Sequence, residues 1–138
     1  MKKLILLFTV VLVGLSSCSN DDDSGSQDPL IGTWTWFKSF ENGVEEPLDD
    51  CDKKDNIVVA ADGTLTETYY YDNNGTCESD GTDMATWENT GGGTYRIVYS
   101  GDDIIDIKIT FEGNTFFVEE SETFGGETYT YKIVYIKS

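Results

Sequence analysis

The residues that could do chemistry in this sequence are its many carboxylates and its three cysteines; it has no histidine. It holds 26 Asp and Glu residues against 9 Lys and Arg, a formal charge of −17 at pH 7. Without histidine the commonest general base is missing. A hydrolase built on paired carboxylates needs two of them held across a cleft, and no spacing in the chain indicates such a pair. We therefore expect no catalytic residue, no cofactor and no enzymatic activity.

Cys18 ends a segment with the features of an export signal. Two lysines precede an apolar run, residues 4–15, and a Leu-Ser-Ser-Cys sequence closes at Cys18. This order is typical of a secretory signal, whereas a membrane-spanning helix needs about 20 apolar residues. The ending in Cys resembles the lipobox of bacterial lipoproteins. The resemblance implies cleavage after residue 17 and a lipid on Cys18 that attaches the chain to a membrane.

Residues 18–29 have the composition of a flexible, acidic linker. The Ser-Asn-Asp-Asp-Asp run after Cys18 resembles the signal that directs lipoproteins of the Bacteroidetes to the outer face of the outer membrane. A solvated linker alone would explain the same run. We expect a signal peptide over 1–17, a linker over 18–29 and a folded domain over 30–138, anchored at the cell outer membrane and exposed on the surface.

The two remaining cysteines, Cys51 and Cys77, are expected to form a disulfide, because an exported chain meets an oxidising compartment. Two free thiols are the alternative. A zinc site needs about four ligands, and two cysteines without histidine do not supply them.

Several carboxylates flank these cysteines and make the loops around them rich in oxygen. If the disulfide forms, it brings both loops together, and such loops could hold a calcium ion. The spacing lacks the pattern of an EF-hand, so ordinary solvated loops are the favoured reading and no metal site is expected. The calcium candidates are Asp50, Asp52, Asp72 and Glu78.

From residue 30 onward the chain alternates apolar and polar residues between Gly, Asn and Asp turns, which predicts an all-β fold. The eight predicted strands are 32–40, 56–60, 64–71, 84–89, 94–99, 104–111, 115–122 and 128–136. In the first strand Trp34, Trp36 and Phe40 are expected on one face, with Lys38 out of phase. Residues 72–83 read as a loop, and any helix should be short and lie within 41–55. Eight antiparallel strands can close into an up-and-down barrel; an open β-sandwich is the alternative.

One family shows this arrangement. A strand that opens with Gly-Thr-Trp at Trp34 resembles the Gly-x-Trp signature of lipocalins. The order of lipobox, acidic linker, first strand, Cys51, an Asp-Gly-Thr hairpin, Cys77 and a Trp strand at Trp87 is similar to the small lipocalin-like domain of Bacteroidetes lipoproteins. In the last of these strands Ala85 stands where the family usually has glycine. The resemblance covers nearly all of residues 30–138 and implies a barrel. Lipocalins at large carry small apolar ligands, whereas the small lipocalin-like domains mostly have no assigned function.

The aromatic residues are the candidates for such binding, since they combine apolar area with polar tips. The alternative is that they simply fill a small barrel. The candidates are Trp34, Trp36, Tyr69, Tyr71, Trp87, Tyr95, Tyr129 and Tyr131.

The expected partners follow from charge and fold. So acidic a chain repels nucleic acid, which we exclude. We expect a monomer that binds a small, mostly apolar ligand. The competing hypothesis is a structural or protein-interaction module with a filled barrel and a protein partner in the cell envelope.

Overall fold

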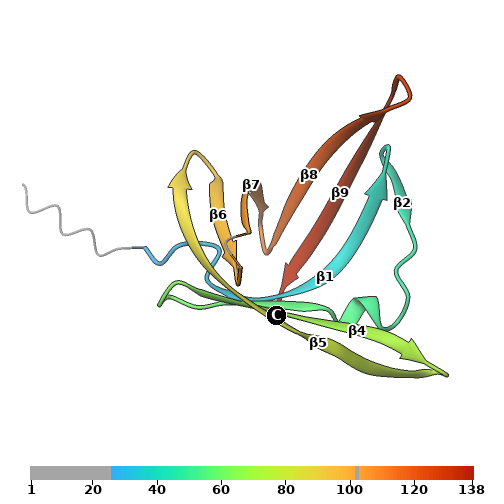
Figure 1. The fold of residues 1–138 in the computed structure, drawn as a ribbon, viewed down its shortest axis with the longest axis horizontal. Helices are drawn as coiled ribbons and strands as arrows, with labels where there is room; N and C mark the ends of the chain where they lie inside the picture. Colours follow the sequence, from blue (N-terminus) through green and yellow to red (C-terminus); the bar gives the residue numbers. More distant parts are fainter. Residues whose placement is uncertain (1–25, 102) are drawn as a thin grey trace, which may run out of the picture.

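The alternating segments form antiparallel strands of one sheet (Figure 1). The computed structural model describes residues 26–101 and 103–138. Within these residues the structure has nine strands and one short 3₁₀ helix. They are β1 (Gly32–Glu41), β2 (Val44–Glu46), η1 (Asp52–Lys54), β3 (Asn56–Val59), β4 (Thr64–Asn73), β5 (Thr76–Gly91), β6 (Thr94–Tyr99), β7 (Ile104–Glu112), β8 (Thr115–Phe124) and β9 (Glu127–Lys137).

The sheet closes because β1 pairs with β3 on one side and with β9 on the other. Strands β1 and β3 to β9 therefore form an eight-stranded barrel in which each strand pairs with the next along the chain. Strand β2 is an addition that pairs only with the end of β1, where Phe40 faces Glu45. The predicted up-and-down barrel is confirmed, and the sandwich alternative is wrong because the first and last strands join. The short helix also falls in the predicted range.

One end of the barrel is filled by aromatic side chains. Trp34 and Tyr95 are 2% and 1% exposed. The ring of Phe116 lies edge-on to Trp34 with centroids 4.7 Å apart, and it stacks on Tyr135 at 4.9 Å. Phe111 contacts Trp34, Tyr95 and Phe116 in the same cluster. Since such side chains bury large areas, this end is solid.

The segment before β1 covers that solid end. Leu30 is buried, and its carbonyl accepts a 2.7 Å hydrogen bond from Nε1 of Trp34. The Asp28 carboxylate accepts hydrogen bonds from the Tyr95 hydroxyl at 3.0 Å and from the Asn89 amide at 2.7 Å. Ordered contacts of the barrel thus begin two residues ahead of the predicted domain start.

A β-bulge in β1 changes which side chains share a face. The register with β9 runs from Trp36 opposite Tyr135 to Lys38 opposite Val134, so Phe37 is an extra residue. Beyond it the alternation slips by one position, which puts Phe40 opposite Lys132 on the outer face. The prediction that Phe40 shares a face with Trp34 and Trp36 is therefore wrong. The bulge also explains why Lys38 is out of phase, because it points outward.

Residues 72–83 are not a loop. Strands β4 and β5 continue through them as one long hairpin that projects from the barrel and turns at Asn74-Gly75. Both turn residues have positive φ, 53° and 86°, as an Asn-Gly hairpin turn requires. The disulfide between Cys51 and Cys77 joins this hairpin to the segment that holds η1, which confirms the predicted pairing.

Three predictions fall outside the described residues: the signal peptide over 1–17, the lipid on Cys18, and the linker up to residue 25. In the part of the chain that the structure describes, no helix is long and apolar enough to cross a membrane.

Candidate ligand-binding site

A cavity of about 110 Å³ lies inside the barrel, next to the aromatic cluster of the solid end. Thirteen residues line it; ten are aliphatic or Phe, two are Tyr, and one is Glu. The aliphatic walls come from β3, β4, β6, β7 and β8, and Leu30 contributes from the segment that covers the solid end. The cavity is therefore mostly apolar and is built by side chains from around the whole barrel.

The cavity lies where it does because large and small inward residues are unevenly distributed along the strands. Trp34, Tyr95 and Phe116 occupy the solid end, whereas the next inward positions carry Ile97 on β6 and Ile109 on β7. Aliphatic side chains leave central space that indole and phenyl rings would fill. One half of the barrel is consequently packed and the other half is hollow.

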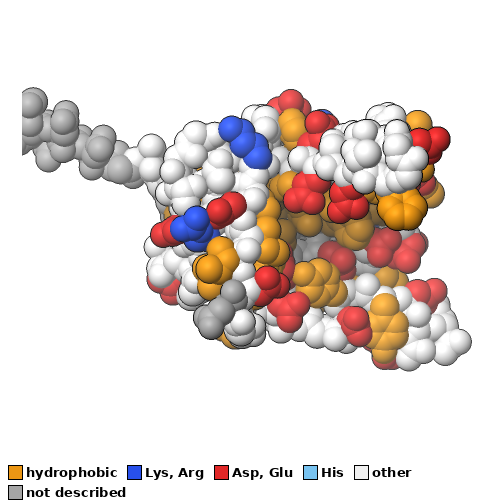
Figure 2. Space-filling model, turned by 45° about the horizontal axis from the view of Figure 1, so that its top comes forward, with side chains coloured by type: hydrophobic (Ala, Val, Ile, Leu, Met, Phe, Trp, Pro, Cys, Tyr) orange, Lys and Arg blue, Asp and Glu red, His pale blue; other side chains and the backbone are white. Residues whose placement is uncertain are grey.

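Beyond the cavity the barrel opens. Tyr69 and Tyr131 point inward by the strand register yet are 40% and 41% exposed. Three further hollows of about 220, 360 and 210 Å³ share lining residues with the cavity. In Figure 1 the β8–β9 hairpin diverges from the β4–β5 hairpin on the side away from the segment before β1. Figure 2 shows the surface hollowed there, with hydrophobic side chains inside the hollow.

Glu67 on β4 is the one charged residue in the cavity lining. Its Oε2 accepts a 2.7 Å hydrogen bond from the Tyr69 hydroxyl and a 2.9 Å hydrogen bond from the Tyr99 hydroxyl. Glu67 also lines the two hollows that Tyr69 lines. An inward, half-buried carboxylate with two hydroxyls thus marks the boundary between the apolar cavity and the opening.

The surroundings of Glu67 keep the nearby tyrosines protonated. Burial, together with the Glu67 charge and hydrogen bond, raises the pKa of Tyr99 well above its ordinary value. Burial and the hydrogen bond to Glu67 raise the pKa of Tyr69 in the same direction. Burial is also the main cause of the raised pKa of Tyr135, with Glu67 and Asp55 contributing. These hydroxyls therefore ionise only at a higher pH than an ordinary tyrosine.

Acidic residues surround the opening. Asp55 lines the hollow beside Trp36, Asp83 and Asp103 line the hollow beside Tyr99, and Glu120 lines the hollow beside Tyr131. Burial raises the pKa of Asp55 above its ordinary value, although the hydrogen bond from the Tyr70 backbone N–H opposes this. Among the described residues, no Lys or Arg lines the cavity or these three hollows. Acidic side chains around the hollow are visible in Figure 2.

The eight aromatic candidates from the sequence do not gather around one pocket, and none of them lines the cavity. Trp34 and Tyr95 belong to the solid end, and Trp87 packs against it with its Nε1 donating to the Ala60 carbonyl at 2.9 Å. The others lie toward or beyond the opening. Trp36 and Tyr69 line one hollow, and Tyr131 lines another. The Tyr71 hydroxyl bonds Glu78 on the projecting hairpin, and the Tyr129 hydroxyl bonds Glu127 at the start of β9.

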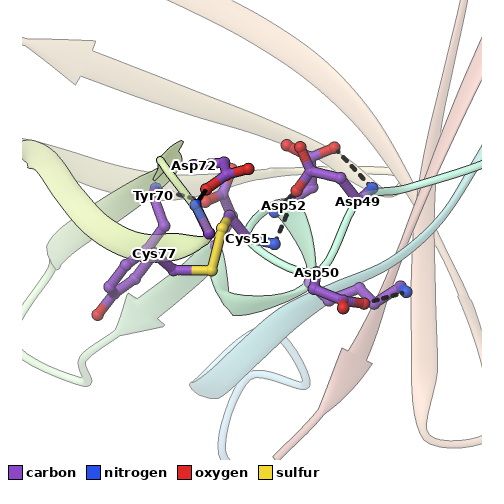
Figure 3. Close-up of a disulfide and its surroundings, with 10 residues drawn as sticks. Asp49, Asp50, Cys51, Asp52, Tyr70, Asp72 and Cys77 are labelled. Carbon is purple, nitrogen blue, oxygen red and sulfur yellow. Dashed lines mark hydrogen bonds and ion pairs between the residues drawn. A yellow bond between two sulfur atoms is a disulfide. The ribbon is translucent and has the colours of Figure 1, made fainter.

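Each calcium candidate forms a hydrogen bond or ion pair with a different partner; Asp50, Asp52 and Asp72 are labelled in Figure 3. Asp50 forms an ion pair with Lys53, and Asp52 accepts a hydrogen bond from the Asp49 backbone N–H. Asp72 accepts one from the Gly75 backbone N–H, and Glu78 accepts one from Tyr71. In the described part of the chain no group of three or more His, Cys, Asp or Glu residues is arranged to hold a metal ion.

Glu67 and Tyr135 are not among the site residues predicted from the sequence. The signal for Glu67 is its position: it lies between Leu65 and Tyr69 in the alternation of β4, so it must point inward with them. Tyr135 follows from the same rule on β9. Selection by aromatic type alone passed over the inward carboxylate.

Comparison with known proteins gives one family match and a similar solved structure. The family model described as "Lipocalin-like domain" matches residues 30–118. Among solved structures, the chain is similar to the possum milk whey lipocalin trichosurin, crystallised at pH 4.6 with bound 4-ethylphenol, with 12% sequence identity and a TM-score of 0.42 over 76% of this chain and 73% of that chain. No curated protein sequence matches the chain.

Proposed function

Since the chain belongs to the lipocalin-like domain family, we propose that its barrel binds a small, mostly apolar molecule in the cavity between the aromatic cluster and the opening. Members of this family are typically binding proteins. The protein acts by holding its ligand and not by transforming it.

The observation that carries this proposal is the half-hollow barrel. A core that served stability alone would be packed at the density of protein interiors, as the end around Trp34 is. The other half instead keeps about 110 Å³ of apolar space that opens toward solvent past Tyr69 and Tyr131. An apolar cavity with a few convergent polar groups is the usual form of a small-molecule site.

The size of the cavity limits the ligand. A dry, apolar cavity of about 150 Å³ binds a benzene molecule, and the cavity of this barrel is somewhat smaller. A single ring or a short alkyl chain therefore lies partly in the cavity and partly in the adjoining hollows.

We also propose that the domain is a lipoprotein of the outer membrane, anchored through Cys18 as in the Bacteroidetes. The Leu-Ser-Ser-Cys sequence after a short apolar run and the acidic residues that follow it support this proposal. A surface position would give the barrel access to small molecules outside the cell.

Ligand binding is tested with hexan-1-ol, a neutral probe of the right length, added to the domain carrying ¹³C-labelled methyl groups. We expect saturable chemical-shift changes at Ile97, Ile109 and Val118, which line the cavity. The control is Val118→Phe, in which a phenyl ring occupies the cavity at a cost of about 1–3 kcal/mol of stability. A correctly folded domain whose methyl signals respond to no six-carbon probe, neutral or charged, would contradict the proposal.

The anchor is tested by mass spectrometry of the protein from its native membrane. We expect Cys18 as the first residue, with fatty acyl groups attached, and release of a Cys18→Ser variant from the membrane fraction. A native chain that retains residues 1–17 and carries no lipid would refute the anchor and leave the binding proposal intact.

A further inference from the structure

The charged residues that line the cavity and its adjoining hollows are of one sign. Five carboxyl residues line the cavity or its adjoining hollows: Asp55, Glu67, Asp83, Asp103 and Glu120. The described cationic side chains lie away from these hollows: Arg96 lies beside Glu88 and Asp106, Lys38 lies beside Glu45, and Lys137 lies over the Trp34 ring at the solid end. The interior therefore has a negative potential that the barrel's own cations do not neutralise at short range.

Glu67 is the member of this set that reaches the cavity. Both tyrosine hydroxyls bond its Oε2. Within the described residues no ion pair involves Glu67, and no hydrogen bond reaches its Oε1. A charged group in apolar surroundings is costly unless it is paired, so this oxygen is a ready acceptor for a donor that arrives with the ligand.

The two tyrosines fix where that donor must lie. Tyr99 bonds the carboxylate from β6, and Tyr69 bonds it from β4, the strand that carries Glu67 itself. The Glu67 side chain therefore has little freedom to turn toward solvent. Because aliphatic side chains form the cavity wall next to Glu67, a ligand whose apolar body fills the cavity places its polar end at Glu67.

We propose that the ligand of this barrel is a small amine, with an apolar body of one ring or a short chain and an ammonium group that pairs with Glu67. This inference rests on the proposed function and specifies its ligand class. Charge-assisted hydrogen bonds are about twice as strong as neutral ones, so the amine is favoured over a neutral molecule of equal size. A carboxylate is disfavoured, because it would bring a like charge next to Glu67.

The experiment compares three six-carbon probes that differ only in the end group: hexylamine, hexan-1-ol and hexanoate. Each is titrated calorimetrically into the folded domain at pH 7 and low salt. We expect hexylamine to bind about tenfold or more tightly than hexan-1-ol, the ratio that about 1.4 kcal/mol gives, and hexanoate to bind more weakly than both.

Two variants locate the effect. Glu67→Gln keeps the shape and an acceptor oxygen for the tyrosines but removes the charge, so we expect it to lose the preference for hexylamine while hexan-1-ol binds as before. Glu112→Gln is the matched control. It changes net charge equally, but Glu112 is exposed at the β7–β8 turn beside the solid end, and we expect the preference to remain.

The outcomes separate the two proposals. If hexan-1-ol or hexanoate binds as tightly as hexylamine, or if Glu67→Gln retains the preference, the amine inference is overturned and the binding function stands. If none of the three probes binds the folded domain, both are overturned. Should Glu67→Gln fail to fold by far-ultraviolet circular dichroism, the comparison of the three probes on the unmodified domain still decides.

Discussion

The hydroxyl of Tyr99 on β6 donates a 2.9 Å hydrogen bond to Oε2 of Glu67 on β4. Strand β5 lies between these two strands, so the bond crosses the inside of the barrel over an intervening strand. It connects wall residues that the sheet does not join directly and fixes the carboxylate at the top of the cavity.

Tyr99→Phe removes this bond and leaves the buried side of Glu67 with one hydroxyl donor. Hydrogen bonds to charged groups contribute about 1.5–3 kcal/mol, so we expect the free energy of unfolding to fall by about that amount in urea titrations. The control is Tyr71→Phe, because the Tyr71 hydroxyl bonds Glu78 on the exposed hairpin, where such changes cost less than about 0.5 kcal/mol. Equal losses in the two variants would contradict the interior role of Tyr99.

Alkaline pH should destabilise the barrel. Burial raises the pKa of Tyr95, Tyr99 and Tyr135 above the ordinary value of 10. A group whose folded pKa is raised contributes stability that is complete below its unfolded pKa and is lost as pH rises through the folded pKa. We expect the urea midpoint to be steady between pH 7 and 9 and to fall above pH 10.

Tyr135→Phe identifies one source of that fall. The variant lacks one of the groups with a raised pKa, so its midpoint should decrease less steeply between pH 10 and 11.5 than that of the parent. A spectrophotometric titration of tyrosinate should likewise lose one late-ionising group. Parallel pH profiles for the two proteins would be evidence against this assignment.

The disulfide should stabilise the projecting hairpin. Replacing Cys51 and Cys77 by Ser opens a loop closed over 26 residues, which in the chain-entropy model costs about 3–4 kcal/mol. We expect a lower urea midpoint and faster amide exchange in the hairpin turn and around η1, with the amides of β7 and β8 still the slowest. An unchanged urea midpoint after complete reduction of the disulfide would contradict the stabilising role of the disulfide.

The contacts of Asp28 should stabilise the solid end. Asp28→Ala removes the acceptor for the Tyr95 hydroxyl, the Asn89 amide and the Leu30 backbone N–H, and we expect a loss of about 1–3 kcal/mol. Asp28→Asn keeps one acceptor oxygen and should lose less. If neither variant changes the urea midpoint, the segment before β1 is not part of the cooperative fold.

The alternation of apolar and polar residues predicted the fold well, because the face of the sheet on which a side chain lies depends only on whether its position is odd or even. It gave all eight barrel strands and the inward residues of β7 and β9. It failed at Phe37, where one extra residue reverses the parity; the sequence marked the place only through Lys38. It also failed over 72–83, since the Asn-Gly turn there is flanked by polar residues and not by the alternating apolar ones that reveal a hairpin.

The site was harder to predict than the fold. Alternation states that Trp34 and Tyr69 both point inward, but it does not give their height along the barrel axis. That height depends on the stagger between strands, and it separates the solid end from the opening. Glu67 could have been found by its parity in β4, whereas the collection of acidic residues from four separate segments around the opening requires the closed barrel.

The segment before β1 covers the solid end, so the chain enters the barrel at its floor. The opening, with its acidic margin, lies at the opposite pole. If the chain is anchored upstream of Asp28 as proposed, the attachment connects to the solid end, and the opening lies on the far side of the domain from the point of attachment.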